Sequence, residues 1–166
     1  MTPTTNHPDL SVRLQGDQQQ VAVVTLTRPA KRNALNDGLI LAIRDAFQNL
    51  PTSVKAAVID GEGEHFCAGL DLSELSERDA AEGVFHSRMW HAALDCVEKG
   101  TVPVIAALHG AVVGGGLELA SACHIRVADE TTFYALPEGT RGIFVGGGGA
   151  VRVPKLIGAA RMTDMM

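Results

Sequence analysis

Two glutamates stand in sequence settings where a carboxyl group can do acid–base chemistry. Glu118 lies in the apolar run Leu-Glu-Leu-Ala at residues 117–120, and Glu138 lies in Leu-Pro-Glu-Gly at residues 136–139. An apolar setting such as that of Glu118 raises the pKa of a carboxyl group and suits proton transfer near neutral pH. Each glutamate alone also fits a solvated or helix-capping residue. The pair forms our first set of candidate catalytic residues.

Three consecutive glycines, Gly114 to Gly116, precede Glu118. They follow a short apolar run and lead into a helical pattern. Glycine lets a ligand approach the backbone, and the N–H groups of a first helical turn can hold an anion or a developing oxyanion. The motif lacks the Lys of a GxxxxGK[ST] phosphate loop and fits the dinucleotide motif GxGxxG poorly. Close packing of a helix on a strand, without any function, is the structural alternative.

A second glycine turn has the sequence GEGEHFCAGLDL and occupies residues 61–72. It also follows a predicted buried strand, and its small residues at 67–69 would expose backbone N–H groups. Two such turns favour a ligand site, because open α/β sheets bind ligands in crevices at the ends of their strands. A third glycine run, residues 146–149, is expected to lead into a helix and could also face a ligand.

Other kinds of site are poorly supported. The histidines show no metal-binding spacing, and the sequence contains no GxSxG nucleophile motif. Cys67 has no evident base beyond His65. The three cysteines form no CxxC pair, so we expect free, mostly buried thiols in a reducing cytoplasm rather than a disulfide framework or a zinc site.

The apolar pattern predicts the elements that must position these residues. Three short apolar runs bounded by turn residues are typical of strands buried on both faces: Val21–Leu26, residues 54–59 and residues 102–108. Residues 36–50 carry apolar side chains three or four apart, as on one face of a helix. A longer helix is expected from about Ser76 to Gly100, with its apolar face formed by Ala81, Phe85, Met89, Ala92 and Cys96.

Strands that alternate with helices imply right-handed crossovers and a mostly parallel sheet in an α/β fold. Residues 123–129 alternate apolar and polar, which predicts a further strand with one wet face. The length of 166 residues fits one domain. Residues 1–20, the N-terminal tail and first strand, lack the apolar core of a signal peptide, and the tail is expected to be loose. Residues 21–166 form the core domain.

The composition limits the classes of partner. A net charge of −5 argues against a basic nucleic-acid platform, and no apolar stretch reaches the length of a membrane span. We therefore expect a protein that binds neither nucleic acid nor membrane.

Four segments together resemble the enoyl-CoA hydratase/isomerase, or crotonase, superfamily. They are RPAKRNALN, HFCAGLDL, VIAALHGAVVGGGLELASACHIRVAD and ALPEGTRGIFVGGGGAVRVPKLIG, in the order and spacing of the family. The resemblance runs from about Val21 to Met166. It implies a spiral of ββα units with mostly parallel sheets and flanking helices, and an acyl-CoA thioester as substrate.

The resemblance also implies roles for particular residues. The backbone N–H groups of Leu70 and Gly115 match the family's oxyanion hole, which polarises the thioester carbonyl. Glu118 and Glu138 match its two catalytic glutamates, which in hydratases hold one water between them. That water attacks C3 of a trans-2-enoyl-CoA, and Glu138 delivers the proton at C2.

The remaining expectations concern binding and assembly. Coenzyme A, as part of the substrate, would lie along the backbone of Ala34, Ala68, Leu70, Asp71 and Leu72, and Lys31 and Arg32 could meet its phosphates. No metal and no dissociable cofactor is implied. Full-length members form homotrimers or paired trimers and continue with C-terminal helices, so the core domain is expected to be truncated at its C-terminal end.

Alternatives to hydration stay open at this point. Relatives that only isomerise double bonds typically keep the carboxylate matching Glu138 and lose the other, so the presence of both favours an enoyl-CoA hydratase. An enoyl-CoA isomerase or an acyl-CoA thioester hydrolase of the same superfamily is the alternative. A non-catalytic module for CoA binding or assembly is a third hypothesis.

Overall fold

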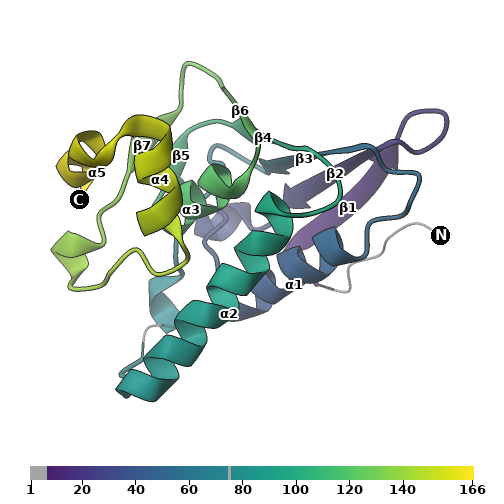
Figure 1. The fold of residues 1–166 in the computed structure, drawn as a ribbon. Coiled ribbons are helices and arrows are strands. Elements are labelled where there is room, and N and C mark those ends of the chain that lie inside the picture. The colour runs from purple at the N-terminus through teal and green to yellow at the C-terminus, as the bar shows by residue number, and fades with distance from the viewer. Residues whose placement is uncertain (1–6, 75) are drawn as a thin grey trace.

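Two sheets and five helices make up the described part of the chain, residues 7–74 and 76–166 of a computed structural model (Figure 1). The strands are β1 (Leu10–Gln15), β2 (Val21–Leu26), β3 (Ala56–Gly61), β4 (Val104–Leu108), β5 (Ala111–Val113), β6 (Ile125–Ala128) and β7 (Phe133–Ala135). The helices are α1 (Asp37–Gln48), α2 (Ala80–Glu98), α3 (Gly115–Ala122), α4 (Gly149–Ile157) and α5 (Ala159–Met165). Short 3-10 turns cover Pro29–Lys31, Leu72–Glu74 and Gly139–Arg141.

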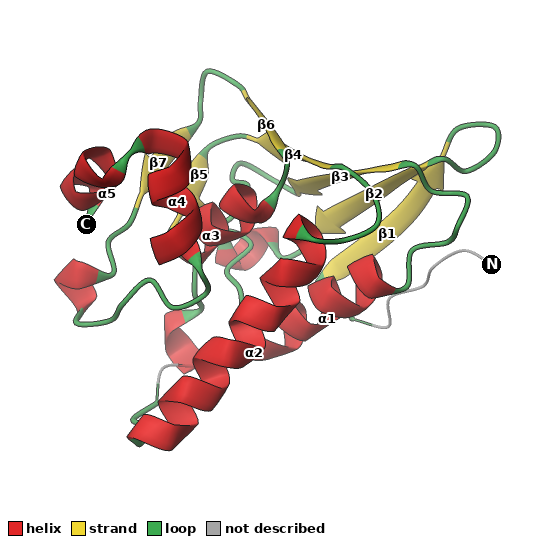
Figure 2. Cartoon of the chain, in the orientation of Figure 1, coloured by secondary structure: helices red, strands yellow, loops and turns green. Residues whose placement is uncertain are grey.

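The larger sheet has the strand order β1-β2-β3-β4-β6 among the described residues. β1 pairs antiparallel with β2, and every other neighbouring pair is parallel. The helices α1 and α2 lie side by side on one face of this sheet (Figure 2). The fold is therefore the α/β class that the sequence predicts, with a mostly parallel sheet and flanking helices.

A ββα unit repeats in the second half of the chain. β4, β5 and α3 form one unit, and β6, β7 and α4 form the next. β6 pairs parallel with β4 and β7 pairs parallel with β5, so the second unit lies directly beside the first. A bridge between Cys67 and Val112 brings the turn that follows β3 to the other edge of β5. This arrangement sets both glycine turns next to the small sheet formed by β5 and β7.

The boundaries predicted from the sequence are close to the observed ones. Val21–Leu26 is β2 as predicted, and the strands predicted at 54–59 and 102–108 begin two residues later, as β3 and β4. β1 places an ordered strand inside the first 20 residues; the part of the expected tail at residues 1–6 lies outside the described residues.

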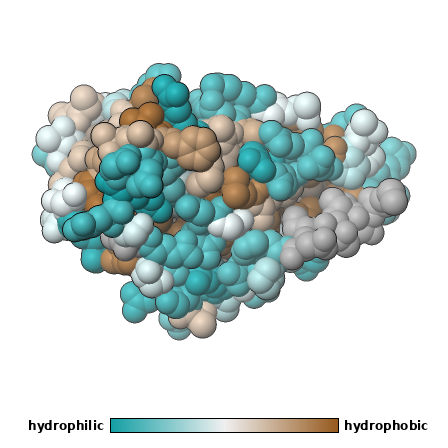
Figure 3. Space-filling view, turned by 90° about the horizontal axis from the view of Figure 1, so that it is seen from below, coloured by the Kyte–Doolittle hydropathy of each residue, from teal (hydrophilic) through white to brown (hydrophobic). Residues whose placement is uncertain are grey.

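The apolar face predicted for the long helix is wrong in its amino-terminal part, whereas Met89 and Cys96 pack against the core as predicted. α2 buries Trp90, Ala93, Leu94 and Val97, whereas the side chain of Phe85 is 75% exposed. The amino-terminal part of α2 extends beyond the large sheet, so its apolar residues have no sheet beneath them (Figure 1). Seen from the side of α1 and α2, the surface is mainly hydrophilic with scattered hydrophobic patches (Figure 3).

The solvent-exposed face of the strand at residues 123–129 is also predicted incorrectly, because its apolar side chains are the exposed ones. Ile125 and Val127 in β6 are more than half exposed, although Cys123 before them is buried. β6 is the last strand of the described sheet, and these two apolar side chains point away from the core. Alternation alone cannot tell which face of an edge strand is covered.

One buried side chain joins the two segments that lead to the site. Asn33 is fully buried, and its Oδ1 accepts a hydrogen bond from the backbone N–H of Arg28. Its Nδ2 donates to the backbone oxygens of Glu62 and His65, at 2.9 and 2.8 Å. Asn33 adopts the left-handed conformation, with φ of 55°, which asparagine tolerates better than most residues.

We expect Asn33→Ala to lower the free energy of unfolding by about 2–4 kcal/mol, because three partly buried hydrogen bonds to the backbone are lost and alanine is strained at this φ. Urea unfolding would measure the loss. Asn49→Ala is the matched control, since Asn49 is exposed and its side chain donates only to the oxygen of Asp45. Equal stability of the two variants would contradict this role of Asn33.

Candidate functional site

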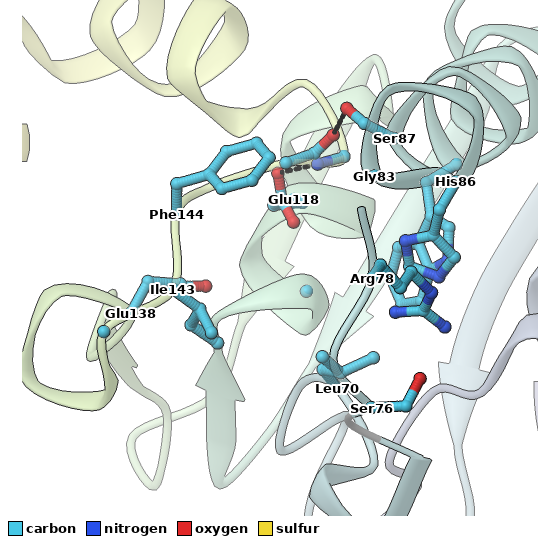
Figure 4. Close-up of a pocket in the computed structure, with 15 residues that line it drawn as sticks. Leu70, Ser76, Arg78, Gly83, His86, Ser87, Glu118, Glu138, Ile143 and Phe144 are labelled. Atoms are coloured by element: carbon cyan, nitrogen blue, oxygen red, sulfur yellow. Dashed lines mark hydrogen bonds between the residues drawn. The ribbon is translucent and has the colours of Figure 1, made fainter. Parts of the chain in front are cut away.

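A cavity of about 280 Å³ lies where the two glycine turns, α2, α3 and the loop before α4 meet (Figure 4). Leu70, Gly115, Glu118 and Glu138 all line it. Residues that lie up to 68 positions apart in the sequence (from 70 to 138) thus line one cavity. The structure places together all four residues that the sequence analysis marked as catalytic candidates.

Glu118 is held by the third glycine run. Its side chain is buried, and its Oε1 accepts hydrogen bonds from the backbone N–H groups of Gly147 and Gly149, both at 2.8 Å. Burial raises the pKa of Glu118, and the two N–H donors oppose that rise. A Cβ at either glycine would come within 3.0 Å of the glutamate side chain, so residues 146–149 form a fitted cradle for this carboxyl group.

Arg152 holds this glycine loop in place. The sequence analysis did not identify this residue. Its side chain is 6% exposed, and its Nη1 donates to the backbone oxygen of Gly147 at 3.1 Å. Its other nitrogens pair with Asp95 at 2.6 Å and Glu98 at 2.7 Å, both on α2. The one available signal was an arginine in an otherwise apolar stretch directly after the glycines.

A second bond from α2 reaches the same loop. The Oγ of Ser87 donates to the backbone oxygen of Gly146 at 2.7 Å (Figure 4). The loop that holds Glu118 is therefore attached to α2 directly at Gly146 and, through Arg152, at Gly147.

Glu138 lies on the opposite side of the cavity, directly before the turn Gly139–Arg141. It is 6% exposed, and its Oε2 has no hydrogen-bond partner among the described residues. Burial raises the pKa of Glu138, and the negative charge of Glu138 contributes to the raised pKa of Glu118. A buried carboxyl oxygen without a partner is costly, which favours a protonated group or a bound water at this position.

The three glycines before Glu118 have three different roles. A Cβ at Gly114, which has φ of 52°, would lie 2.8 Å from Oε1 of Glu138. A Cβ at Gly116 would lie 2.4 Å from the backbone oxygen of Cys67, so this glycine permits close packing of α3. A Cβ at Gly115 would meet Trp90, Leu70 and Leu35 only at 3.3–3.6 Å. The packing interpretation therefore holds for Gly116, while the space at Gly115 belongs to the cavity.

The backbones of Leu70 and Gly115 lie beside each other at the cavity. Leu35 donates to the oxygen of Gly69 and accepts from the N–H of Asp71, which leaves the N–H of Leu70 on the other side of its strand-like segment. Gly115 opens α3, where N–H groups have no partner within the helix. A Cβ on Gly115 would lie 3.5 Å from the nitrogen of Leu70. The nitrogen of Leu70 therefore lies close to the open space at Gly115.

The residues expected to bind coenzyme A also lie together. Arg28 donates from Nη1 to the backbone oxygen of Ala34 at 3.1 Å and to Oδ2 of Asp71 at 2.7 Å. Hydrogen bonds from Ser73, then the bond from Arg28, lower the pKa of Asp71 to about 2. Ala68 donates its N–H to the oxygen of Arg32, and Leu72 is 41% exposed.

The alternative chemistry at Cys67 is not supported by its surroundings. Burial raises the pKa of the Cys67 thiol to about 12, and Nδ1 of His65 accepts from the backbone N–H of Ala111. A thiol in this state is a poor nucleophile. Among the described residues, no group of three or more His, Cys, Asp or Glu side chains is placed to hold a metal ion, and no helix is long and apolar enough to cross a membrane.

We expect Glu118→Gln to raise the free energy of unfolding above neutral pH. A carboxyl group with a raised folded-state pKa stabilises the fold when protonated, and this contribution is lost as pH rises through that pKa. Glutamine keeps an oxygen for Gly147 and Gly149 but carries no charge. Urea unfolding at several pH values should show the variant more stable than the wild type at pH 8 and the difference vanishing below pH 4. The exposed Glu130, as Glu130→Gln, is the control; a Glu118→Gln protein less stable at pH 8 would overturn this account.

Comparison with known proteins places this chain in a family. The sequence model of the enoyl-CoA hydratase/isomerase family matches residues 16–166. The 2,3-dehydroadipyl-CoA hydratase of Escherichia coli (strain K12) is 39% identical over 153 residues, which are 90% of this chain and 58% of that protein. A mouse mitochondrial Delta(3,5)-Delta(2,4)-dienoyl-CoA isomerase is 32% identical over 92% of this chain and 51% of its own length.

Solved structures agree with this placement. A Rhodopseudomonas palustris CGA009 protein assigned as an enoyl-CoA hydratase is 60% identical, with a TM-score of 0.92 over 95% of this chain and 60% of its own. The enoyl-CoA hydratase of Bacillus anthracis has a TM-score of 0.84 at 32% identity, over 95% of this chain and 61% of its own. This chain thus spans about 60% of the length of these relatives. From the match along nearly all of its length, the chain belongs to the enoyl-CoA hydratase/isomerase family.

Proposed function

We propose that this protein adds water to the double bond of a trans-2-enoyl-CoA and forms a 3-hydroxyacyl-CoA. The observation that carries the proposal is the presence of two buried carboxyl groups, Glu118 and Glu138, in one cavity that the backbones of Leu70 and Gly115 also line. Hydration needs one group to accept a proton from water and one to give a proton to carbon, whereas moving a double bond needs a single group that does both in turn.

The oxygen of the thioester carbonyl would accept hydrogen bonds from the N–H groups of Leu70 and Gly115. These donors draw electron density from the conjugated double bond, which makes C3 electrophilic and stabilises the enolate oxygen that forms. The ionised Glu118 accepts a proton from the water as its oxygen bonds to C3. Protonated Glu138 then gives a proton to C2, and exchange with solvent restores both carboxyl groups.

The coenzyme A part of the substrate would lie along the backbone at Ala34, Ala68, Asp71 and Leu72. Arg28 fixes this surface through its bonds to the first and third of these residues. A Thermobifida fusca relative, 25% identical with a TM-score of 0.88, has been solved in complex with CoA, which supports this part of the proposal. The exposed Lys31 and Arg32 could meet the phosphates.

The reaction as proposed uses no metal and no dissociable cofactor, since both proton transfers and the oxyanion are assigned to groups of the chain. A homotrimer or a pair of trimers and a cytoplasmic location stay predictions from the family resemblance.

The absorbance of the conjugated thioester tests the function directly. We expect it to fall when the protein is mixed with trans-2-enoyl-CoA esters, with 3-hydroxyacyl-CoA as the product. Glu138→Gln should lower kcat about 10²- to 10⁴-fold, because proton delivery to C2 is lost. The control Glu130→Gln should not change it. Free CoA as the product would show hydrolysis, and a shifted double bond without water would show isomerisation; either would replace hydration, and no turnover would favour a binding module.

Gly115→Ala tests the pair of N–H donors. The new methyl group would contact its neighbours at 3.3–3.6 Å, so the fold should tolerate it, but it would occupy the place of the carbonyl oxygen beside Leu70. We expect kcat to fall about 10²- to 10³-fold, the cost of one lost oxyanion donor, with little change in melting temperature. Gly116→Ala, whose methyl group would clash with Cys67, should instead lower the melting temperature. An active Gly115→Ala protein would exclude an oxyanion at this place.

A further inference from the structure

The cavity has one polar wall and one apolar wall, and the polar wall is not used by the reaction proposed above. Ser76, Arg78 and His86, from α2 and the segment before it, lie on one side, and Ile143 and Phe144 lie on the other (Figure 4). Glu118 and Glu138 lie apart from the polar wall, so an acyl chain that starts at the reacting carbons would extend toward it.

Asp37, at the start of α1, organises the polar wall. Its Oδ1 accepts from Nε1 of Trp90 at 2.9 Å and is bonded to Nε2 of His86 at 2.7 Å. Its Oδ2 lies 4.0 Å from Nη2 of Arg78, which is an ion pair but too long for a hydrogen bond. Asp37 therefore fixes the rings of Trp90 and His86 but accepts no hydrogen bond from the guanidinium group of Arg78.

Arg78 has unused hydrogen-bonding capacity in a partly buried place. Its side chain is 28% exposed, and none of its five N–H donors is within hydrogen-bond distance of an acceptor among the described residues. Removing such a group from water without a partner costs free energy, and a purely aliphatic acyl chain would increase that cost. A ligand that carries an acceptor to this wall would reduce it.

We propose that the acyl group of the substrate ends in a carboxylate, which Arg78 binds. This inference rests on the proposed function, because it takes the cavity to be the acyl site. A guanidinium group matches a carboxylate with two parallel hydrogen bonds, which a hydroxyl group cannot form. The negative charge of Asp37 opposes a second carboxylate, but Asp37 is already bonded to Trp90 and His86 and faces Arg78 with one oxygen only.

Binding of saturated CoA esters tests the inference without any turnover. Calorimetry would compare matched pairs of equal chain length: succinyl-CoA with butanoyl-CoA, adipoyl-CoA with hexanoyl-CoA and suberoyl-CoA with octanoyl-CoA. We expect the wild type to bind at least one dicarboxylic ester more tightly than its partner. Arg78→Met should lower that ratio about 10- to 100-fold, the usual effect of losing hydrogen bonds to a charged group. The control is Arg88→Met, which changes an exposed arginine on α2 and should leave the ratio unchanged.

The binding experiment must also distinguish a carboxylate at the end of the acyl chain from a neutral polar group. Adipoyl-CoA should bind more tightly than 6-hydroxyhexanoyl-CoA, and Arg78→Lys, which keeps the charge but not the fork of donors, should keep only part of the preference. Equal binding of the hydroxy ester, or no preference for a carboxylate at any chain length, would overturn the proposal. The ratio of binding affinities tests the role of Arg78 independently of turnover. If neither trans-2-hexenedioyl-CoA nor trans-2-hexenoyl-CoA is hydrated, that result would count against the proposed function alone.

Discussion

Placing the carboxyl group of Glu118 in a largely dry interior costs free energy, and much of the surrounding structure serves to hold it there. Two backbone N–H groups from the loop at residues 146–149 bond to one of its oxygens. That loop needs glycine because the carboxyl group leaves no room for side chains. Arg152 and Ser87 then attach the loop to α2. The result is a carboxyl group with one oxygen fixed by the protein and the other available to the cavity.

The three glycines before Glu118 each make room for a different neighbour. Gly116 lets α3 pack against Cys67, Gly114 makes room for Glu138, and Gly115 leaves an open space between two N–H groups. A single run of three identical residues thus fixes the helix, admits the second acid and leaves a place for an oxygen. The positions cannot be exchanged, since each faces a different neighbour.

The sequence predicts the local pattern well and the long-range contacts poorly. The strand Val21–Leu26, the helix α1 and the paired glycine turns follow from apolar spacing and from glycine positions, which are local properties. The apolar face of α2 was wrong because Phe85 has suitable spacing but lies beyond the sheet. Arg152 and Asn33 act through contacts with distant segments, and nothing in their own neighbourhood in the sequence reveals those partners. The four candidate site residues came from motifs and from the family resemblance, both of which can be read along the sequence, and the structure places all four along one cavity.

The helix α2 has 19 residues and is about 28 Å long, and it touches the site at two places. Toward its amino-terminal half, His86 and Trp90 bond to Asp37 and form the far wall of the cavity. Toward its carboxy-terminal end, Asp95 and Glu98 hold Arg152 and, through it, the loop around Glu118. The helix therefore connects one wall of the cavity to the loop that holds Glu118. Under the proposed function, an acyl chain that contacts this wall would press on the same helix that supports Glu118.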